Sequence, residues 1–167
     1  IAERALISDE LLFVPSINRH AYVVRMADGS VVADFRADDW LWTTPGVQGS
    51  KLFFGDFGGS VYGLNITSNG VEQLWGPASL KGERVRSGAA VVNGVIVVVD
   101  RKPVVTFIDA NDGSILNTVP IEGAGTVRAN LVVKDGAAYF STTGGKLFRA
   151  EPASRRVVEV QLSGVKK

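Results

Sequence analysis

The stretch Lys51 to Trp75, KLFFGDFGGSVYGLNITSNGVEQLW, decides the fold of this 167-residue chain. A short apolar run at 52–54 leads into a glycine-rich turn over 55–59. An alternating run at 61–64 follows, and a polar turn ending in Asn69-Gly70 precedes the last segment. Period-two alternation bounded by Gly and Asn is typical of antiparallel strands joined by tight turns. The stretch therefore predicts a β-hairpin followed by a third strand.

The same unit recurs along the chain. Asp28-Gly29 opens DGSVVADF and Asp112-Gly113 opens DGSILNTV, so the turn returns after 112 − 28 = 84 positions, with Asn69-Gly70 almost midway. Short apolar strands are expected at 10–14, 51–55, 94–99 and 136–141, each followed by an alternating strand at 21–26, 61–66, 105–110 and 146–151. Steps of roughly 40 to 44 residues holding about four short strands are typical of β-propeller blades.

The composition favours an all-β chain. Hydrophobic residues make up 46% of the sequence, the 19 glycines are scattered through turns, and no window of ten or more residues keeps a helical period without Gly or Pro. We expect a single propeller segment, 1–167, of about four four-stranded blades, with boundaries near 2–38, 43–75, 85–119 and 127–162. Four such blades rarely close a ring by themselves, and an uncapped end exposes apolar surface, so we expect further blades or a partner to complete the ring.

Charge and cysteine content exclude several classes of site. Eighteen basic residues against 17 acidic ones give a net charge of +1 without a basic run, which argues against nucleic-acid binding. The absence of cysteine excludes disulfides and thiolate zinc sites. No apolar run approaches the ~20 residues of a membrane span. The chain begins at Ile1 with no signal-like region, and we expect it to be trimmed from something longer.

One repeat carries a more specific pattern. Residues 107–117, FIDANDGSILN, keep the spacing A-x-D-x-x-T-G-x-x-x-W with Asn117 in place of Trp, and 23–33 and 149–159 keep it more loosely. Leu64 to Trp75 keeps the Gly and the Trp with one residue inserted. This pattern resembles the pyrroloquinoline-quinone-like (quinoprotein-like) propeller repeat. In that family the Trp packs one blade on the next, so the resemblance implies a structural role for Trp75.

The resemblance also bears on function. Quinoprotein dehydrogenases of this repeat resemble complete eight-bladed rings and hold the quinone on calcium, often beside an adjacent-cysteine disulfide. This chain lacks cysteine and an evident acidic cluster, and is about half that length. It is more similar to the non-catalytic, cofactor-free outer-membrane-assembly lipoprotein type. The resemblance implies a segment of a larger, eight-bladed ring that serves as a protein-docking scaffold, not an enzyme, in a membrane-associated bacterial complex, periplasmic or at the cell surface.

Two alternatives remain open. The chain is otherwise a fragment of a quinoprotein dehydrogenase, whose missing blades would supply the quinone and calcium ligands, or a sugar- or peptide-binding propeller.

Three residues form a candidate ligand- or partner-binding group. Trp42, Arg86 and Arg128 precede the innermost strands of successive blades, with spacings of 86 − 42 = 44 and 128 − 86 = 42. We expect them to project toward one another at the channel mouth, where two arginines and an indole could bind a carboxylate or an acidic loop. The alternative is that they cap strand ends or pair with Glu83 and Asp38.

Two other features point to ordinary structure. His20 is the only histidine, which excludes a metal site built on paired imidazoles, and its place in the Asn18-Arg19-His20 corner predicts an exposed turn residue. The run 109–113, DANDG, is similar to a calcium loop, but Gly113 comes one position early and no Glu stands at the twelfth position. We expect a plain turn there.

Overall fold

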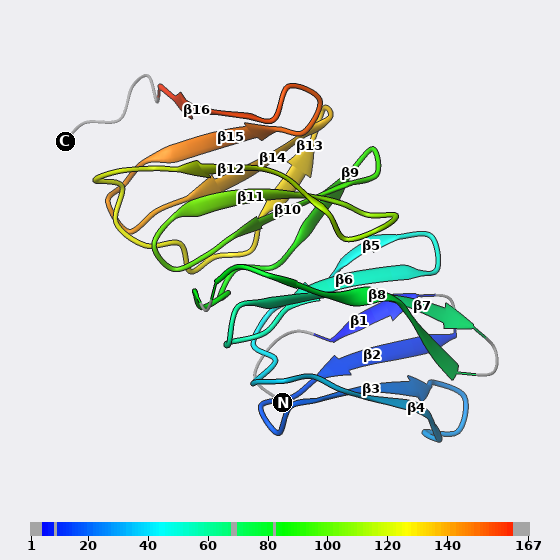
Figure 1. Cartoon of the computed structure of the whole chain (residues 1–167). Coiled ribbons are helices and arrows are strands. Elements are labelled where there is room, and N and C mark those ends of the chain that lie inside the picture. The colour runs from blue at the N-terminus through cyan, green and yellow to red at the C-terminus, as the bar shows by residue number, and fades with distance from the viewer. Residues whose placement is uncertain (1–4, 9, 68–69, 82, 162–167) are drawn as a thin grey trace.

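The computed structural model describes residues 5–8, 10–67, 70–81 and 83–161. Within these residues the chain forms sixteen strands and no helix, arranged as four antiparallel four-stranded sheets (Figure 1). In each sheet the strands lie in chain order, so every sheet is a simple meander. The predicted all-β architecture of four four-stranded blades is confirmed.

Blades 1 and 2 occupy the N-terminal half of the chain. Blade 1 consists of β1 (Leu6–Ser8), β2 (Leu11–Pro15), β3 (His20–Arg25) and β4 (Val31–Arg36). Blade 2 consists of β5 (Gly46–Gln48), β6 (Lys51–Gly55), β7 (Ser60–Thr67) and β8 (Gly70–Ser79).

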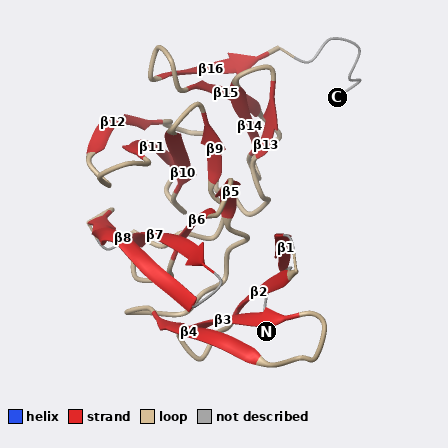
Figure 2. Cartoon of the chain, turned by 90° about the vertical axis from the view of Figure 1, so that its right-hand side faces the viewer, coloured by secondary structure: helices blue, strands red, loops and turns tan. Residues whose placement is uncertain are grey.

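Blades 3 and 4 continue the same order. Blade 3 consists of β9 (Ala90–Val92), β10 (Val95–Val99), β11 (Val104–Asp109) and β12 (Ile115–Pro120). Blade 4 consists of β13 (Val132–Lys134), β14 (Ala137–Ser141), β15 (Leu147–Glu151) and β16 (Arg156–Val160). The first strands lie side by side, with β9 in contact with both β5 and β13 (Figure 2).

The turns follow from Gly, Asn and Asp chemistry. Asn93-Gly94 and Asp135-Gly136 take φ values of 50° and 77°, and of 48° and 72°, which matches the two-residue hairpin turn with both residues left-handed. At the outer hairpins, the Asp28 and Asp112 carboxylates accept hydrogen bonds from the backbone N–H of Ser30 and Ser114 at 2.9 and 2.8 Å. Asn69 lies outside the described residues.

Blade 2 is longer than the sequence predicts. Its end was expected at Trp75, followed by an irregular connection, but β8 continues to Ser79, which pairs with Ser60. The register shifts between Val61 and Gly63, opposite the Gly76-Pro77 dipeptide. A β-bulge is one of the few places where a sheet accommodates proline, because proline has no N–H to donate to the ladder.

The core is divided into three clusters, each between successive blades. Blades 1 and 2 share a cluster that contains Phe13, Leu52 and Phe54, and blades 2 and 3 share one that contains Phe53 and Ile96. The cluster between blades 3 and 4 includes Val97, Phe107, Phe140 and Phe148. Alternation along each strand sends successive side chains to opposite faces, so blades 2 and 3 contribute to two clusters each and blades 1 and 4 to one.

Candidate functional site

A backbone contact repeats at one edge of the blades. In blades 2, 3 and 4, the turn between the second and third strands donates a backbone N–H to the segment that leads into the same blade. The pairs are Phe57 to Trp40, Arg101 to Arg84 and Thr143 to Thr126, each at 2.9 Å. The spacings are again 44 and 42 residues. We call this edge the rim, made of Trp40, Trp42, Phe57, Arg84, Arg86, Arg101, Thr126, Arg128 and Thr143.

Buried hydroxyl groups fix the lead-in segments. The Thr43 hydroxyl donates to the Gly55 carbonyl at 2.9 Å, and the Ser87 hydroxyl, 44 residues later, donates to the Val99 carbonyl at 2.7 Å. Both side chains are buried. Because a buried polar group without a partner is costly, these bonds hold the neighbouring rim residues in a defined place.

Buried carboxylates fix the turns. Asp56 accepts backbone N–H bonds from Gly58 and Ser60 at 2.9 and 2.8 Å. Asp100, at the same place in blade 3, accepts them from Lys102 and Val104 at 2.9 and 3.0 Å. Burial raises the pKa of the Asp100 carboxyl, and the two amide bonds oppose that rise. The turn that carries Arg101 is thus tied to its strands.

Two aromatic and two cationic side chains gather on Phe57. The Arg84 guanidinium carbon lies 4.8 Å from the Phe57 ring centre, and that of Arg86 lies 5.3 Å from it and 5.2 Å from the Trp42 ring. The Trp40 and Trp42 rings lie 5.8 and 6.3 Å from Phe57. We call these five residues the Phe57 cluster. A stacked guanidinium keeps its N–H edges free for a carboxylate.

The arginines on the rim have no acidic partner. Among the described residues, no carboxylate lies within 4.0 Å of the guanidinium nitrogens of Arg84, Arg86 or Arg101. The nearby acid, Glu83, pairs with Lys102 at 2.5 Å, and this bond raises the pKa of Lys102. The rim therefore presents positive charge that the described part of the chain does not neutralise.

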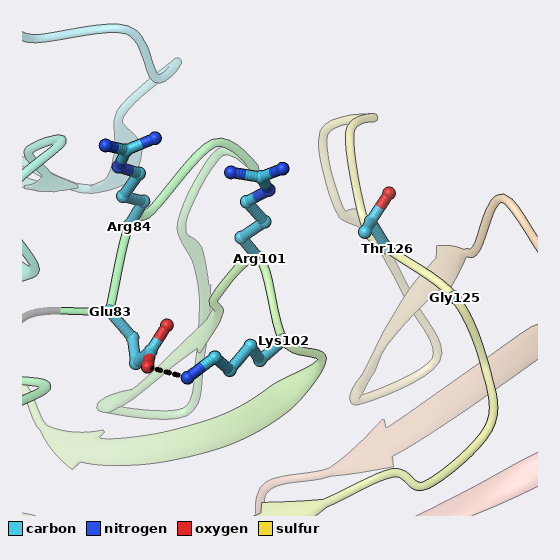
Figure 3. A pocket seen from close by; sticks show the side chains of 6 residues that line it. All are labelled: Glu83, Arg84, Arg101, Lys102, Gly125 and Thr126. Atoms are coloured by element: carbon cyan, nitrogen blue, oxygen red, sulfur yellow. Dashed lines mark hydrogen bonds and ion pairs between the residues drawn. The ribbon is translucent and has the colours of Figure 1, made fainter.

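A pocket of about 420 Å³ opens beside the Phe57 cluster, lined by Glu83, Arg84, Arg101, Lys102, Gly125 and Thr126. Figure 3 shows the Arg84 and Arg101 guanidinium groups pointing to the same side, with Thr126 across the opening and the Glu83–Lys102 pair at the base. The pocket joins the lead-in segments of blades 3 and 4 and extends the cationic surface.

The structure brings together two of the three predicted site residues. Trp42 and Arg86 are in contact, whereas Arg128 is exposed and has no ring or ion-pair contact with any described residue. The reason lies in the turn between them. Phe57 provides the ring on which Arg86 stacks, and the corresponding position in blade 3 is Arg101, a like charge that repels Arg128. The alternative pairing of Arg86 with Glu83 or Asp38 is not formed.

Sequence reasoning missed four rim residues, namely Trp40, Phe57, Arg84 and Arg101. The blade period that relates Trp42 to Arg86 also relates Trp40 to Arg84 and Phe57 to Arg101, so applying it to neighbouring positions would have found them. What the period could not supply is the inward turn that places Phe57 on its lead-in segment.

The two other features are structural. His20 begins β3, where its Nδ1 lies 2.6 Å from the Asp34 carboxylate and its ring stacks on Tyr22. It thus belongs to a strand pair and not to an isolated corner. The run 109–113 forms the predicted turn, in which the Asp109 carboxylate accepts the Asn111 N–H at 2.8 Å.

The described residues contain no group of three or more His, Cys, Asp or Glu side chains that could hold a metal ion. The acids at the rim are engaged elsewhere, Glu83 with Lys102 and Asp56 and Asp100 with backbone amides. The donors that a calcium-held quinone would need are therefore not assembled there. The part of the chain that the structure describes contains no helix long and apolar enough to cross a bilayer.

Sequence comparison finds no matching family model and no matching curated protein. Comparison with solved structures finds the computationally designed Ika4 protein, at 16% identity and a TM-score of 0.71, covering 94% of this chain and 89% of Ika4. The designed Ika8 protein matches at 16% identity and a TM-score of 0.68, covering 93% of this chain and 45% of Ika8.

A natural protein also matches. BamB from Moraxella catarrhalis is 15% identical with a TM-score of 0.63, and the match covers 98% of this chain and 62% of BamB. The chain thus spans less than two thirds of BamB and less than half of Ika8. At these identities the similarity concerns the fold alone. Together with the four meander sheets and their stacked cores, it shows that this chain folds as β-propeller blades.

Proposed function

We propose that this chain is a non-enzymatic, cofactor-free scaffold of the pyrroloquinoline-quinone-like repeat class, which docks a protein partner through the rim. The observation that carries the proposal is the Phe57 cluster, in which Arg84 and Arg86 stack on Phe57 and Trp42 without a carboxylate partner. Aromatic and arginine side chains are the types enriched at binding hot spots. Stacking orders the guanidinium groups beforehand, which lowers the entropy lost on binding.

The chemistry of the rim favours an acidic partner segment. Arg84, Arg86 and Arg101 offer N–H edges suited to bidentate bonds with carboxylates, and Trp40, which is 45% exposed, adds apolar area beside them. Asp or Glu side chains next to an apolar residue would satisfy both features. Attraction between such charges also accelerates association at low salt.

The proposed setting is a membrane-associated bacterial assembly outside the cytoplasm. Two observations support it: the repeat resembles that of the outer-membrane-assembly lipoprotein type, and the fold is similar to that of BamB over 98% of this chain. In this proposal the chain supplies a rigid docking surface, and its partners supply the attachment to the membrane.

Site-specific photo-crosslinking in the source cells tests the proposal. A photoreactive amino acid in place of Trp40 is expected to yield a discrete protein adduct. The same amino acid in place of Met26, which is 47% exposed on the β3–β4 turn, is the matched control and is expected to yield much less. Equal adducts at both positions, or none at Trp40, would contradict docking at the rim.

A further inference from the structure

The blades at the two ends of the chain each leave one face uncovered. Four blades in a closed ring would share four interfaces, but the described residues form three core clusters, between blades 1 and 2, 2 and 3, and 3 and 4. Figure 1 shows the sheets stacked in series from blade 1 to blade 4. The chain is therefore an open arc with two end faces.

The end face of blade 1 has the composition of a buried blade surface. Cross-strand pairs Leu12–Val24 and Val14–Tyr22 place these four side chains on the face opposite Phe13, Ala21 and Val23, which pack on blade 2. Their counterparts 40 residues later are Leu52, Phe54, Tyr62 and Leu64, all between 0% and 3% exposed because blade 1 covers them. In blade 1 the corresponding residues wait for an equivalent cover.

The end face of blade 4 is the complementary surface. Pairs Val132–Tyr139 and Tyr139–Arg149 define a row across β13, β14 and β15. Their counterparts 42 residues earlier, Ala90, Val97 and Phe107, are buried against blade 4 itself. Val132, in contrast, is 63% exposed. Each end face thus matches one side of an interface that the chain already makes three times.

The charges on the two end faces are opposite. Arg149, whose Nε is buried without a hydrogen-bond partner, lies on the blade 4 face, and the corresponding position in blade 3 is the apolar Phe107. Asp34 lies on the blade 1 face, opposite Tyr22 in the β3–β4 pairing. An arginine facing an aspartate across a partly desolvated interface fixes the register of the two surfaces.

We propose that a second copy of this chain covers both end faces, with blade 4 of each copy packing on blade 1 of the other to close a two-fold ring. The length supports this occupant: the arc matches 45% of Ika8, so two arcs correspond to nearly all of that chain at the same curvature. Such a head-to-tail interface is heterologous, and it closes after two copies only if the rotation is correct. This inference concerns surfaces other than the rim and does not depend on the proposed docking function.

Native mass spectrometry of the purified chain provides the first test. We expect a species of twice the 17.8 kDa chain mass. Val24→Glu on the blade 1 face and Val132→Glu on the blade 4 face should each raise the dimer dissociation constant at least about tenfold. Ile115→Glu is the control, because Ile115 is an apolar residue 45% exposed on blade 3, away from both end faces. Circular dichroism checks that each variant is folded.

Mixing the two variants tests the head-to-tail geometry itself. In a mixed dimer, the intact blade 4 face of the Val24→Glu chain meets the intact blade 1 face of the Val132→Glu chain. One interface is restored, so heterodimers should form where neither variant dimerises alone. A wild-type chain that stays monomeric, open-ended polymers, dimers insensitive to both variants, or variants that do not complement each other would overturn the proposal.

Discussion

The indole Nε1 of Trp75 in blade 2 donates a hydrogen bond to the carbonyl oxygen of Ala110 in blade 3, at 3.2 Å. The ring also stacks on Phe53, with centres 6.2 Å apart, and packs directly on the Cα of Gly113. Trp75 thus joins the outer strand of one blade to the β11–β12 turn of the next. This agrees with the structural role that the repeat resemblance implies.

Gly113→Ala should destabilise the protein more than Gly29→Ala. Both glycines occupy the same turn in their blades with φ near 75°, so alanine costs about 1–2 kcal/mol of backbone strain at either. At Gly113 the added Cβ would lie 2.6 Å from the Trp75 ring, whereas at Gly29 nothing lies within 4 Å. We expect a further loss of about 1–3 kcal/mol at Gly113, measured by urea unfolding. Equal losses would contradict the tight packing.

Trp42 and Arg86 should be energetically coupled. A double-mutant cycle with Trp42→Leu and Arg86→Gln is expected to give a coupling of about 0.5–1 kcal/mol in unfolding free energy, because the guanidinium lies 5.2 Å from the indole ring. The matched cycle with Arg128→Gln should give no coupling, since Arg128 touches no ring. A coupling of Trp42 to Arg128 as large as that to Arg86 would refute the arrangement of the rim.

Asp100 and Asp112 should affect the pH dependence of stability in opposite directions. Burial raises the pKa of Asp100 above its ordinary 3.8, so the folded state holds this proton more tightly and stability is lost as pH rises from about 3.8 through the folded value. Hydrogen bonds from Ser114 lower the pKa of Asp112, so its contribution is lost as pH falls below 3.8.

Urea unfolding between pH 2.5 and about 6 would measure both effects. Relative to Asp100→Asn, the wild type should lose stability as pH rises, and relative to Asp112→Asn it should gain stability. The same sign of slope for both comparisons would show that the environment of one of these carboxylates has been misassigned.

The buried hydroxyls that fix the lead-in segments should each contribute to stability. Thr43→Val and Ser87→Ala leave the carbonyls of Gly55 and Val99 without a side-chain donor inside the protein, at a cost of about 1–3 kcal/mol each. Thr118→Val on the exposed face of β12 is the control and should be nearly neutral. Thermal unfolding of the three variants would distinguish them, and three equal melting temperatures would contradict this role.

The fold could be predicted from the sequence because local signals repeat. Asn93-Gly94 and Asp135-Gly136 specify two-residue turns, and period-two alternation on each side specifies which face is buried. The extension of β8 to Ser79 could not be predicted, because Pro77 normally ends a strand and only the bulge opposite it restores pairing.

The candidate site could be predicted only in part. The blade period placed Trp42 and Arg86 at equivalent positions, and they do lie together. Their contact depends on a third residue, Phe57, whose turn folds onto the Trp40 carbonyl through a backbone bond that no side-chain pattern announces. Arg128 shares the spacing but lacks this ring, which is why periodicity alone overestimated the group.

The most direct measurement of the central claim is native mass spectrometry of the protein isolated from its source with bound proteins retained. The wild-type chain should carry another polypeptide. The Arg84→Gln/Arg86→Gln double variant should retain about tenfold less of it or lower still, whereas Arg36→Gln, an exposed arginine on β4, should retain it fully. A chain that carries a quinone and calcium in place of a polypeptide, or a polypeptide retained equally by all three proteins, would contradict docking through the rim.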